Sequence, residues 1–220
     1  MSEPASEPCP LCHCGVSVLL HAEKQRTYRE CANCRLVFVP SIEHIVPEDE
    51  FAHYLTHEND VSDPRYRRFL QPALDAVRFH MPPPARGLEF GCGPGPALAE
   101  MLRASGYSIE LYDLWFEQNT DVLQSTYDFI TLTEVAEHFR RPRREFEQLF
   151  ERLRSGGMLV IMTRPVPVTE AFETWYYRLD PTHVSFYRHE TFLWLAAEMS
   201  AELLLPRPDV AVLRKSAAFP

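Results

Sequence analysis

A glycine-spaced turn at residues 87–95, with the sequence GLEFGCGPG, constrains this chain more than any other segment. A short apolar strand carries the acid Glu89, and glycines then occupy every second position, at Gly91, Gly93 and Gly95. Glycine has no Cβ, so this turn can adopt positive φ angles and bring its backbone close to a ligand. The later third glycine of the dinucleotide fingerprint is missing. We therefore expect a strand–turn–helix unit that binds an adenosine ligand other than NAD.

Three more segments extend this pattern along the chain. They are the strand end Tyr112-Asp113, the run YDFITLTEVAEHFRRP at 127–142 and the run LRSGGMLVIMT at 153–163. Together with the glycine turn, and in this order, they resemble the motifs of the class I S-adenosylmethionine-dependent methyltransferases over residues 65–215. The nearest type is the small-molecule methylases of ubiquinone biosynthesis.

This resemblance implies a fold, a cofactor and a set of binding residues. The fold would be α/β, with a Rossmann-like, doubly wound sheet that closes with a C-terminal antiparallel hairpin. S-Adenosylmethionine would lie with its methionine moiety on the glycine turn, its ammonium group near Glu89 and its ribose on Asp113. Leu114 and residues 131–135 would enclose the adenine, while Cys92 is interpreted as a small apolar filler. The expected cofactor-binding residues are Glu89, Gly91, Cys92, Gly93, Gly95, Asp113, Leu114, Thr133 and Glu134.

One part of the chain departs from that family. Only 14 residues separate Asp113 from Asp128, where a helix, a third strand and another helix usually stand. A parallel crossover alone needs about 10–12 residues. We therefore predict that the third strand is reduced or missing, which removes the usual acidic contact to adenine and leaves Asp121 as a substitute or a turn residue.

The remaining elements follow from apolar periodicity. Asp63 and Pro64 begin a helix that Pro72 should kink, and residues 41–62 form a polar connection. Strands are expected at 88–90, 108–112 and 158–162, helices at 96–105, 143–154 and 190–200, and the closing hairpin at 203–205 and 210–213.

Two cysteine pairs near the N-terminus predict a metal site. Cys9 and Cys12 form one C-x2-C pair and Cys31 and Cys34 another, with 18 residues between the pairs. This spacing is typical of a structural four-cysteine zinc ribbon, in which a hairpin brings the pairs together. So small a module has little core, so the metal would supply most of its folding energy.

Two alternatives stay open for the cysteines. His13 or Cys14 could exchange with one of the four ligands, and a disulfide framework could replace the metal, although nothing indicates export to an oxidising compartment. The predicted layout is a zinc ribbon at 1–40, a connector at 41–62 and the methyltransferase domain at 63–220.

Charge and hydropathy limit the partners. The 220-residue chain has a formal charge of -9, which argues against a broad basic surface for nucleic acid, although a local cluster follows Phe139 at Arg140, Arg141, Arg143 and Arg144. No apolar run reaches the length of a membrane span, and the N-terminus does not resemble a signal peptide. We expect a cytoplasmic protein without membrane contact.

Catalytic candidates lie in two places: in the aromatic segment 175–187, and just after the strand expected at the start of the run 127–142. Histidine titrates near neutrality and suits a general base. His183, oriented by Asp180, is the first candidate and His138 the second, with a structural role open for each.

The expected function is methyl transfer to a small or medium organic acceptor. Two alternatives stay open. An RNA or protein methyltransferase would use the zinc ribbon to bind its macromolecule and would need Arg26, Tyr28, Arg29 and Arg35 to face the cofactor. A non-catalytic S-adenosylmethionine-binding scaffold would use the same glycine turn.

Overall fold

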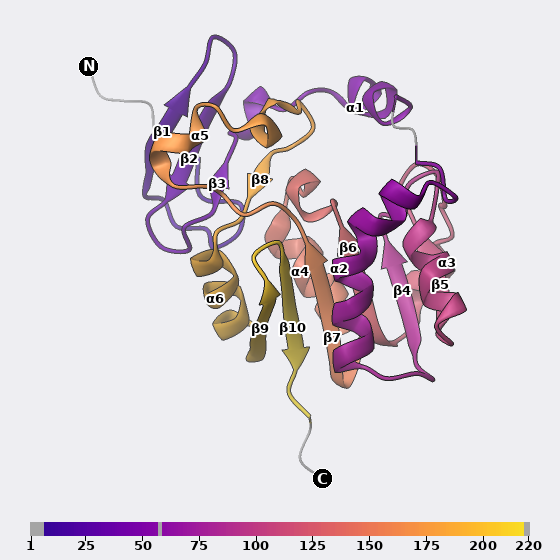
Figure 1. Cartoon of the computed structure of the whole chain (residues 1–220). Helices are drawn as coiled ribbons and strands as arrows, with labels where there is room; N and C mark the ends of the chain where they lie inside the picture. Colours follow the sequence, from indigo (N-terminus) through magenta and orange to yellow (C-terminus); the bar gives the residue numbers. More distant parts are fainter. Residues whose placement is uncertain (1–6, 57–58, 218–220) are drawn as a thin grey trace, which may run out of the picture.

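The computed structural model describes residues 7–56 and 59–217, so the outermost ends of the predicted segments 1–40 and 63–220, and residues 57–58 of the connector, lie outside it. It contains a six-stranded and a four-stranded β-sheet. Figure 1 shows the smaller sheet at one end of the molecule, where the segment of α5 and β8 lies against the N-terminal strands.

The six-stranded sheet has the strand order β5-β4-β6-β7-β10-β9. The first four of these strands are parallel, and β10 is antiparallel to both β7 and β9. This arrangement confirms the predicted doubly wound sheet with its closing hairpin. The strands are β4 (Arg86–Phe90), β5 (Ser108–Tyr112), β6 (Tyr127–Thr133), β7 (Leu153–Met162), β9 (Ala201–Arg207) and β10 (Val210–Lys215).

Helices cover both faces of this sheet. Helices α2 (Pro64–His80) and α3 (Ala97–Ala104) pack on one face, in a core that includes Phe129. Helices α4 (Pro142–Glu151) and α6 (His189–Glu198) pack on the other face, in a core that includes Ile130. Successive residues of a strand point to opposite faces, so the nearly continuous apolar run of β6 serves both cores.

The third strand is absent from the described part of the sheet, as predicted. Between β5 and β6 the chain forms only a 3-10 turn, η2 (Thr120–Gln124), and an isolated bridge between Asp113 and Glu117. β5 is therefore an edge strand, and the short connection leaves its carboxyl end beside the turn.

The smaller sheet joins the N-terminal ribbon to a short strand from the C-terminal half of the chain. β1 (Ser17–Ala22), β2 (Thr27–Cys31) and β3 (Val37–Phe38) form an antiparallel ribbon, and β8 (Ser185–Phe186) adds a fourth strand beside β3. A shared apolar core holds them together, with members from both parts of the chain: Tyr28, Val37, Val39, Val166, Phe172, Tyr177, Val184 and Phe186. The sheet thus combines the predicted ribbon with two residues from the C-terminal half.

The predicted connector contains helical structure. A 3-10 turn, η1 (Ser41–Glu43), precedes helix α1 (Pro47–Tyr54). Pro47 starts α1, and three acidic side chains in its first turn suit the positive end of the helix dipole. None of its residues is buried, which explains why apolar periodicity did not predict it.

One further detail differs from the prediction. β7 begins at Leu153 rather than Met158, and Gly156, at φ +74°, lies inside it where the register with β6 shifts. Helix α2 begins at Pro64, as predicted, and contains Pro72 within its length. The remaining short elements are η3 (Ala136–His138), α5 (Thr169–Phe172) and η4 (Tyr176–Leu179).

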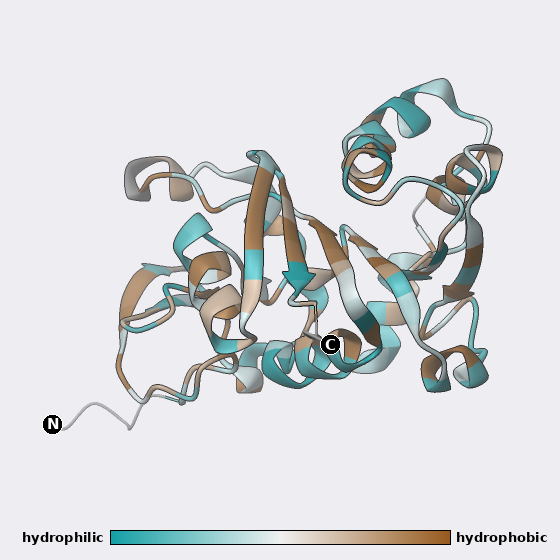
Figure 2. Cartoon of the chain, turned by 90° about the horizontal axis from the view of Figure 1, so that it is seen from below, coloured by the Kyte–Doolittle hydropathy of each residue, from teal (hydrophilic) through white to brown (hydrophobic). Residues whose placement is uncertain are grey.

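The hydropathy of the chain follows this layering. Figure 2 shows apolar strands at the centre, and helices that carry hydrophilic residues on their outer surfaces. None of the helices among the described residues combines the length and the apolar character needed to cross a bilayer.

Candidate active site

A cavity of about 580 Å³ opens where β4, β5 and β6 reach their carboxyl ends. Ligands of open α/β sheets bind at such an edge. Of the nine predicted cofactor-binding residues, all except Gly95 line the cavity, and so do His138, Asp180 and His183. The structure therefore gathers the two predicted groups, which lie on different elements, around one space.

The glycine turn is shaped by positive φ angles and by Asp113. Gly91 has φ +75° and Gly93 has φ +62°. A Cβ on Gly91 would lie 2.5 Å from Val135 Cγ2, so no side chain fits there. The Gly93 backbone N–H donates to Asp113 Oδ2 at 2.9 Å, and the N–H groups of Trp115 and Phe116 donate to Oδ1 at 2.8 and 3.0 Å. One carboxylate thus fixes both loops that border the cavity.

Gly95 has a different role from its two neighbours. A Cβ at this position would lie 1.8 Å from the backbone oxygen of Asn59, in the segment that leads into α2. The absence of a side chain therefore lets another part of the chain cross the turn. Asn59 itself lines the cavity.

Glu89 presents a buried carboxyl group to the cavity. Its side chain lines the space although the residue is only 4% exposed, and its Oε2 atom has no hydrogen-bond partner among the described residues. Burial raises the pKa of Glu89 to about 8. An unpaired buried carboxyl is costly, so this atom is suited to a cationic ligand.

Cys92 is also buried, and burial raises the pKa of its thiol to about 12. A thiolate is the reactive form of cysteine. At neutral pH Cys92 is therefore a small apolar group, in agreement with its interpretation as a filler.

Aromatic side chains that the sequence did not single out form one wall of the cavity. Trp115 and Phe116 follow Asp113, and Phe51 of α1 stacks on Trp115 with ring centroids 4.9 Å apart. Leu114 lines the cavity and is 60% exposed. The buried hydroxyl of Thr131 instead donates to the Leu88 carbonyl at 3.5 Å, outside the lining, while Thr133, Glu134 and Val135 contribute to it.

His183 is a buried, neutral imidazole. The residue is 7% exposed, and burial lowers its pKa to about 4. Its Nδ1 atom lies 2.7 Å from the Tyr177 carbonyl oxygen. A carbonyl can only accept a hydrogen bond, so Nδ1 carries the proton and Nε2 is left with a free lone pair. His183 therefore has the protonation state of a base throughout the neutral pH range.

Asp180 faces that lone pair. Its Oδ2 lies 3.8 Å from His183 Nε2 and 3.1 Å from His53 Nε2. Burial alone would raise the pKa of Asp180, but the adjacent His183 and hydrogen bonds from Thr182 outweigh it and hold the pKa well below its usual range. An ionised Asp180 would stabilise a proton taken up by His183.

His138 lies against the same group, with its ring centroid 4.8 Å from that of His183. Its Nδ1 atom is 3.3 Å from the Thr182 carbonyl oxygen. The preceding residue, Glu137, is fully buried, and its two oxygens accept hydrogen bonds from the hydroxyls of Thr163 and Tyr177. Burial raises the pKa of Glu137 to about 8.

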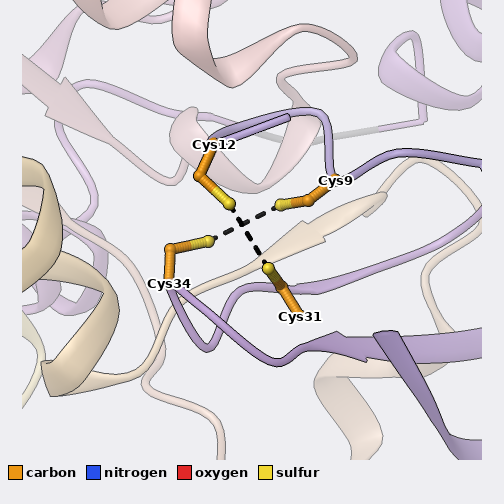
Figure 3. A group of neighbouring side chains, drawn as sticks. All are labelled: Cys9, Cys12, Cys31 and Cys34. Atoms are coloured by element: carbon orange, nitrogen blue, oxygen red, sulfur yellow. Dashed lines mark hydrogen bonds between the residues drawn. The ribbon is translucent and has the colours of Figure 1, made fainter. Parts of the chain in front are cut away.

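The four cysteines of the two pairs converge, as Figure 3 shows. Cys9 Sγ lies 3.5 Å from Cys34 Sγ, and Cys12 Sγ lies 3.3 Å from Cys31 Sγ. All four sulfurs lie within 4.8 Å of one another, close to the separation of about 3.8 Å that a tetrahedral zinc ion with bonds of about 2.3 Å requires. No disulfide joins them, and Cys14 contacts the backbone of Val16 instead.

A macromolecular substrate would need Arg26, Tyr28, Arg29 and Arg35 to be available at the surface, but these side chains mostly contact other parts of the protein. Tyr28 is fully buried, and Arg26 donates hydrogen bonds to backbone carbonyls of residues 178–183. Arg29 bonds to Ser17, and Arg35 forms an ion pair with the buried Glu30.

Comparisons with known proteins agree with this architecture. A family model described as a methyltransferase domain matches residues 59–204. An O-methyltransferase family protein from Burkholderia thailandensis has a similar structure, with a TM-score of 0.51, 15% identity and coverage of 78% of this chain and 69% of that chain. No curated protein matches the sequence.

A second solved structure covers more of the chain. It is the 1,6-didemethyltoxoflavin-N1-methyltransferase of the same organism, with bound 1,6-didemethyltoxoflavin and S-adenosylhomocysteine. The TM-score is 0.50 at 14% identity, and 89% of this chain and 98% of that chain are covered. These structures support the fold, and the family model spans about two thirds of the chain. The chain belongs to the methyltransferase-domain family.

Proposed function

We propose that this protein transfers a methyl group from S-adenosylmethionine to a small organic acceptor, with His183 as the general base. The observation that carries the proposal is the single cavity that brings the unpaired Oε2 atom of Glu89 and the free Nε2 lone pair of His183 to one space. The first suits a cationic cofactor, and the second suits removal of a proton from an acceptor.

The residues of the cavity fit S-adenosylmethionine, which supplies a methyl group on a sulfonium when it is bound. Glu89 would accept hydrogen bonds from the ammonium group, and this would satisfy its unpaired oxygen. Asp113 keeps lone pairs for ribose hydroxyls beyond its three backbone contacts. Trp115 and Leu114 would border the adenine, in place of the acid that a third strand normally provides.

On the acceptor side of the cavity, His183 and Asp180 are arranged to remove a proton from the acceptor. His183 Nε2 takes a proton from a hydroxyl or amine, and the Nδ1–H bond to Tyr177 fixes the ring for this role. Asp180 stabilises the imidazolium that forms. The ring of His138 packs edge-on against that of His183 and restricts its movement.

We further propose that Cys9, Cys12, Cys31 and Cys34 hold a structural zinc ion. Four cysteine ligands close the tetrahedron and leave no position for a substrate. The internal contacts of Arg26, Tyr28, Arg29 and Arg35 favour a small acceptor over a macromolecule bound by this module.

Two measurements test the proposed function. Calorimetry with S-adenosylmethionine should detect binding that Asp113→Ala abolishes, and a folded, metal-loaded protein that does not bind would refute the cofactor assignment. Incubation with a cofactor carrying a labelled methyl group should then label a molecule in a metabolite extract. Label on bulk RNA or protein instead would overturn the small-molecule assignment.

The base is tested separately. His183→Gln should bind the cofactor normally and lose about 10²- to 10⁴-fold in turnover, the usual contribution of a general base. Full turnover by this variant would eliminate the role of His183. His189→Gln is a matched control, because His189 lies on α6, outside the cavity lining.

A further inference from the structure

We propose that the metal module, residues 7–40, positions the base, and that Arg26 is the positioning residue through which it acts. The inference rests on the proposed role of His183. The structure places the β1–β2 hairpin against the base loop, residues 176–184, and the hairpin contacts the backbone of that loop rather than the cavity. Loss of the metal or of Arg26 should therefore displace His183 and leave the cofactor half intact.

The Arg26 guanidinium binds three carbonyl groups of the base loop. Its Nη1 donates to the Asp180 oxygen at 2.7 Å and to the Arg178 oxygen at 3.3 Å, and its Nη2 donates to the His183 oxygen. These carbonyls belong to the proposed base His183, to Asp180 and to Arg178 just before them. A planar guanidinium with several fixed N–H groups can impose one conformation on such a turn.

Two more contacts of the hairpin reach the same loop. The buried Tyr28 hydroxyl donates to the Arg178 oxygen at 2.9 Å. The Arg178 side chain, only 5% exposed, forms an ion pair with Glu23 and bonds through Nε to the Phe172 carbonyl at 2.9 Å. The loop is thus held through its backbone and through one of its side chains.

Strand pairing connects the four-cysteine site to the base loop. Cys31 ends β2, and Cys34 lies in the turn that leads into β3. β3 pairs with β8, which begins two residues after His183, and the Val39 N–H donates to the Val184 oxygen at 3.0 Å. A metal that fixes the β2–β3 turn therefore fixes the strand at which the base loop ends.

The cofactor half is built differently. Glu89, Gly93 and Asp113 lie at the carboxyl ends of β4 and β5 or just beyond them, and Asn59 lies against the glycine turn at Gly93 and Gly95. The hydrogen bonds of Arg26 and Tyr28 described above go to the base loop. A change in the hairpin should therefore alter the conformation of the base loop and leave the cofactor-binding residues at the ends of β4 and β5 in place.

The test compares Arg26→Gln with Arg29→Gln in the full-length, metal-loaded protein. Arg29 lies on β2, three residues after Arg26, but it bonds to Ser17 inside the module, so it controls for charge and for damage to the ribbon. We expect Arg26→Gln to accelerate amide hydrogen exchange in residues 176–187 by about tenfold, through local opening of the loop. Exchange in residues 86–113 and the affinity for S-adenosylmethionine should stay unchanged.

Nitrogen NMR of the imidazoles supplies a readout that bulk stability does not move. His183 should be the Nδ1–H tautomer in the wild type and in Arg29→Gln, and a mixture of tautomers in Arg26→Gln. Removal of the metal from the wild type with a chelator should reproduce the Arg26→Gln pattern. Wild-type exchange and a wild-type tautomer in Arg26→Gln would overturn the proposal. A wild type that fails to bind the cofactor would instead refute the proposed function, since loop protection is measured without it.

Discussion

Without cofactor, the Glu89→Gln variant should be more stable than the wild type, and this difference should increase as the pH rises. Burial raises the pKa of this carboxyl from 4.5 to about 8. A raised pKa means that its contribution to stability is complete below pH 4.5 and is lost as the pH rises toward 8. At about 1.4 kcal/mol per pH unit, this difference corresponds to a loss of about 5 kcal/mol in the wild type. Gln has a similar shape, cannot ionise and avoids the loss.

Urea unfolding of both cofactor-free proteins between pH 5 and 8.5 measures the effect. All other titrating groups are common to both, so the difference in the free energy of unfolding isolates Glu89. It should grow with pH to a few kcal/mol, which corresponds to about 10 °C in Tm for a domain of this size. Glu100→Gln, at an exposed position of α3, is the matched control for the loss of one glutamate.

The same variant should bind S-adenosylmethionine more weakly, because Gln offers the ammonium group no charge. Stability and binding would then change in opposite directions, as expected for a group retained for function. Parallel pH profiles for wild type and Glu89→Gln would refute the reasoning about burial. A parallel loss of stability and binding would show that Glu89 supports the fold instead.

Three other predictions concern the turn, the aromatic wall and the metal. In Gly91→Ala, the new Cβ would lie 2.5 Å from Val135 on a backbone with positive φ, so urea unfolding should show a loss of about 2 kcal/mol or more in the free energy of unfolding. Gly15→Ala, where no atom lies near the new Cβ, should change this free energy little, and equal effects of the two substitutions would contradict the prediction. Trp115→Ala should weaken cofactor binding about tenfold by calorimetry, unlike Phe79→Ala outside the cavity, and an unchanged affinity would exclude the wall from the adenine side. Chelation should lower the Tm, and an unchanged Tm with proven metal loss would refute a structural ion.

The parts of the fold that the sequence predicted depend on local or length-based signals. Strand 108–112 has the same bounds in the structure, because its alternating apolar residues Ile109 and Leu111 lie between Gly106 and Asp113. The missing strand followed from the 14 residues available between Asp113 and Asp128. The predicted Asp113 reaches the cavity, but its three backbone partners were invisible, because they depend on how two loops meet.

The parts that were missed depend on contacts between distant residues. Phe51 lies in a mostly polar helix that has no buried residue, so no periodic pattern marks it as the partner of Trp115. The sequence gives no sign that Arg26 is anything but a surface cation, whereas in the structure it binds backbone carbonyls of Asp180 and His183, about 150 residues away. β8 contains two residues, too few to carry a strand pattern.

The pairing of β3 with β8 also imposes an order on the growing polypeptide. All four cysteines have left the ribosome soon after Cys34 is made, but Ser185, the partner of Phe38, follows about 150 residues later. At about 5–20 residues per second this is a delay of about 8–30 s. During that interval β3 has no partner strand on the side where β8 later pairs. Chains that stop before residue 185 should therefore expose the edge of β3, a ready target for chaperones or for aggregation.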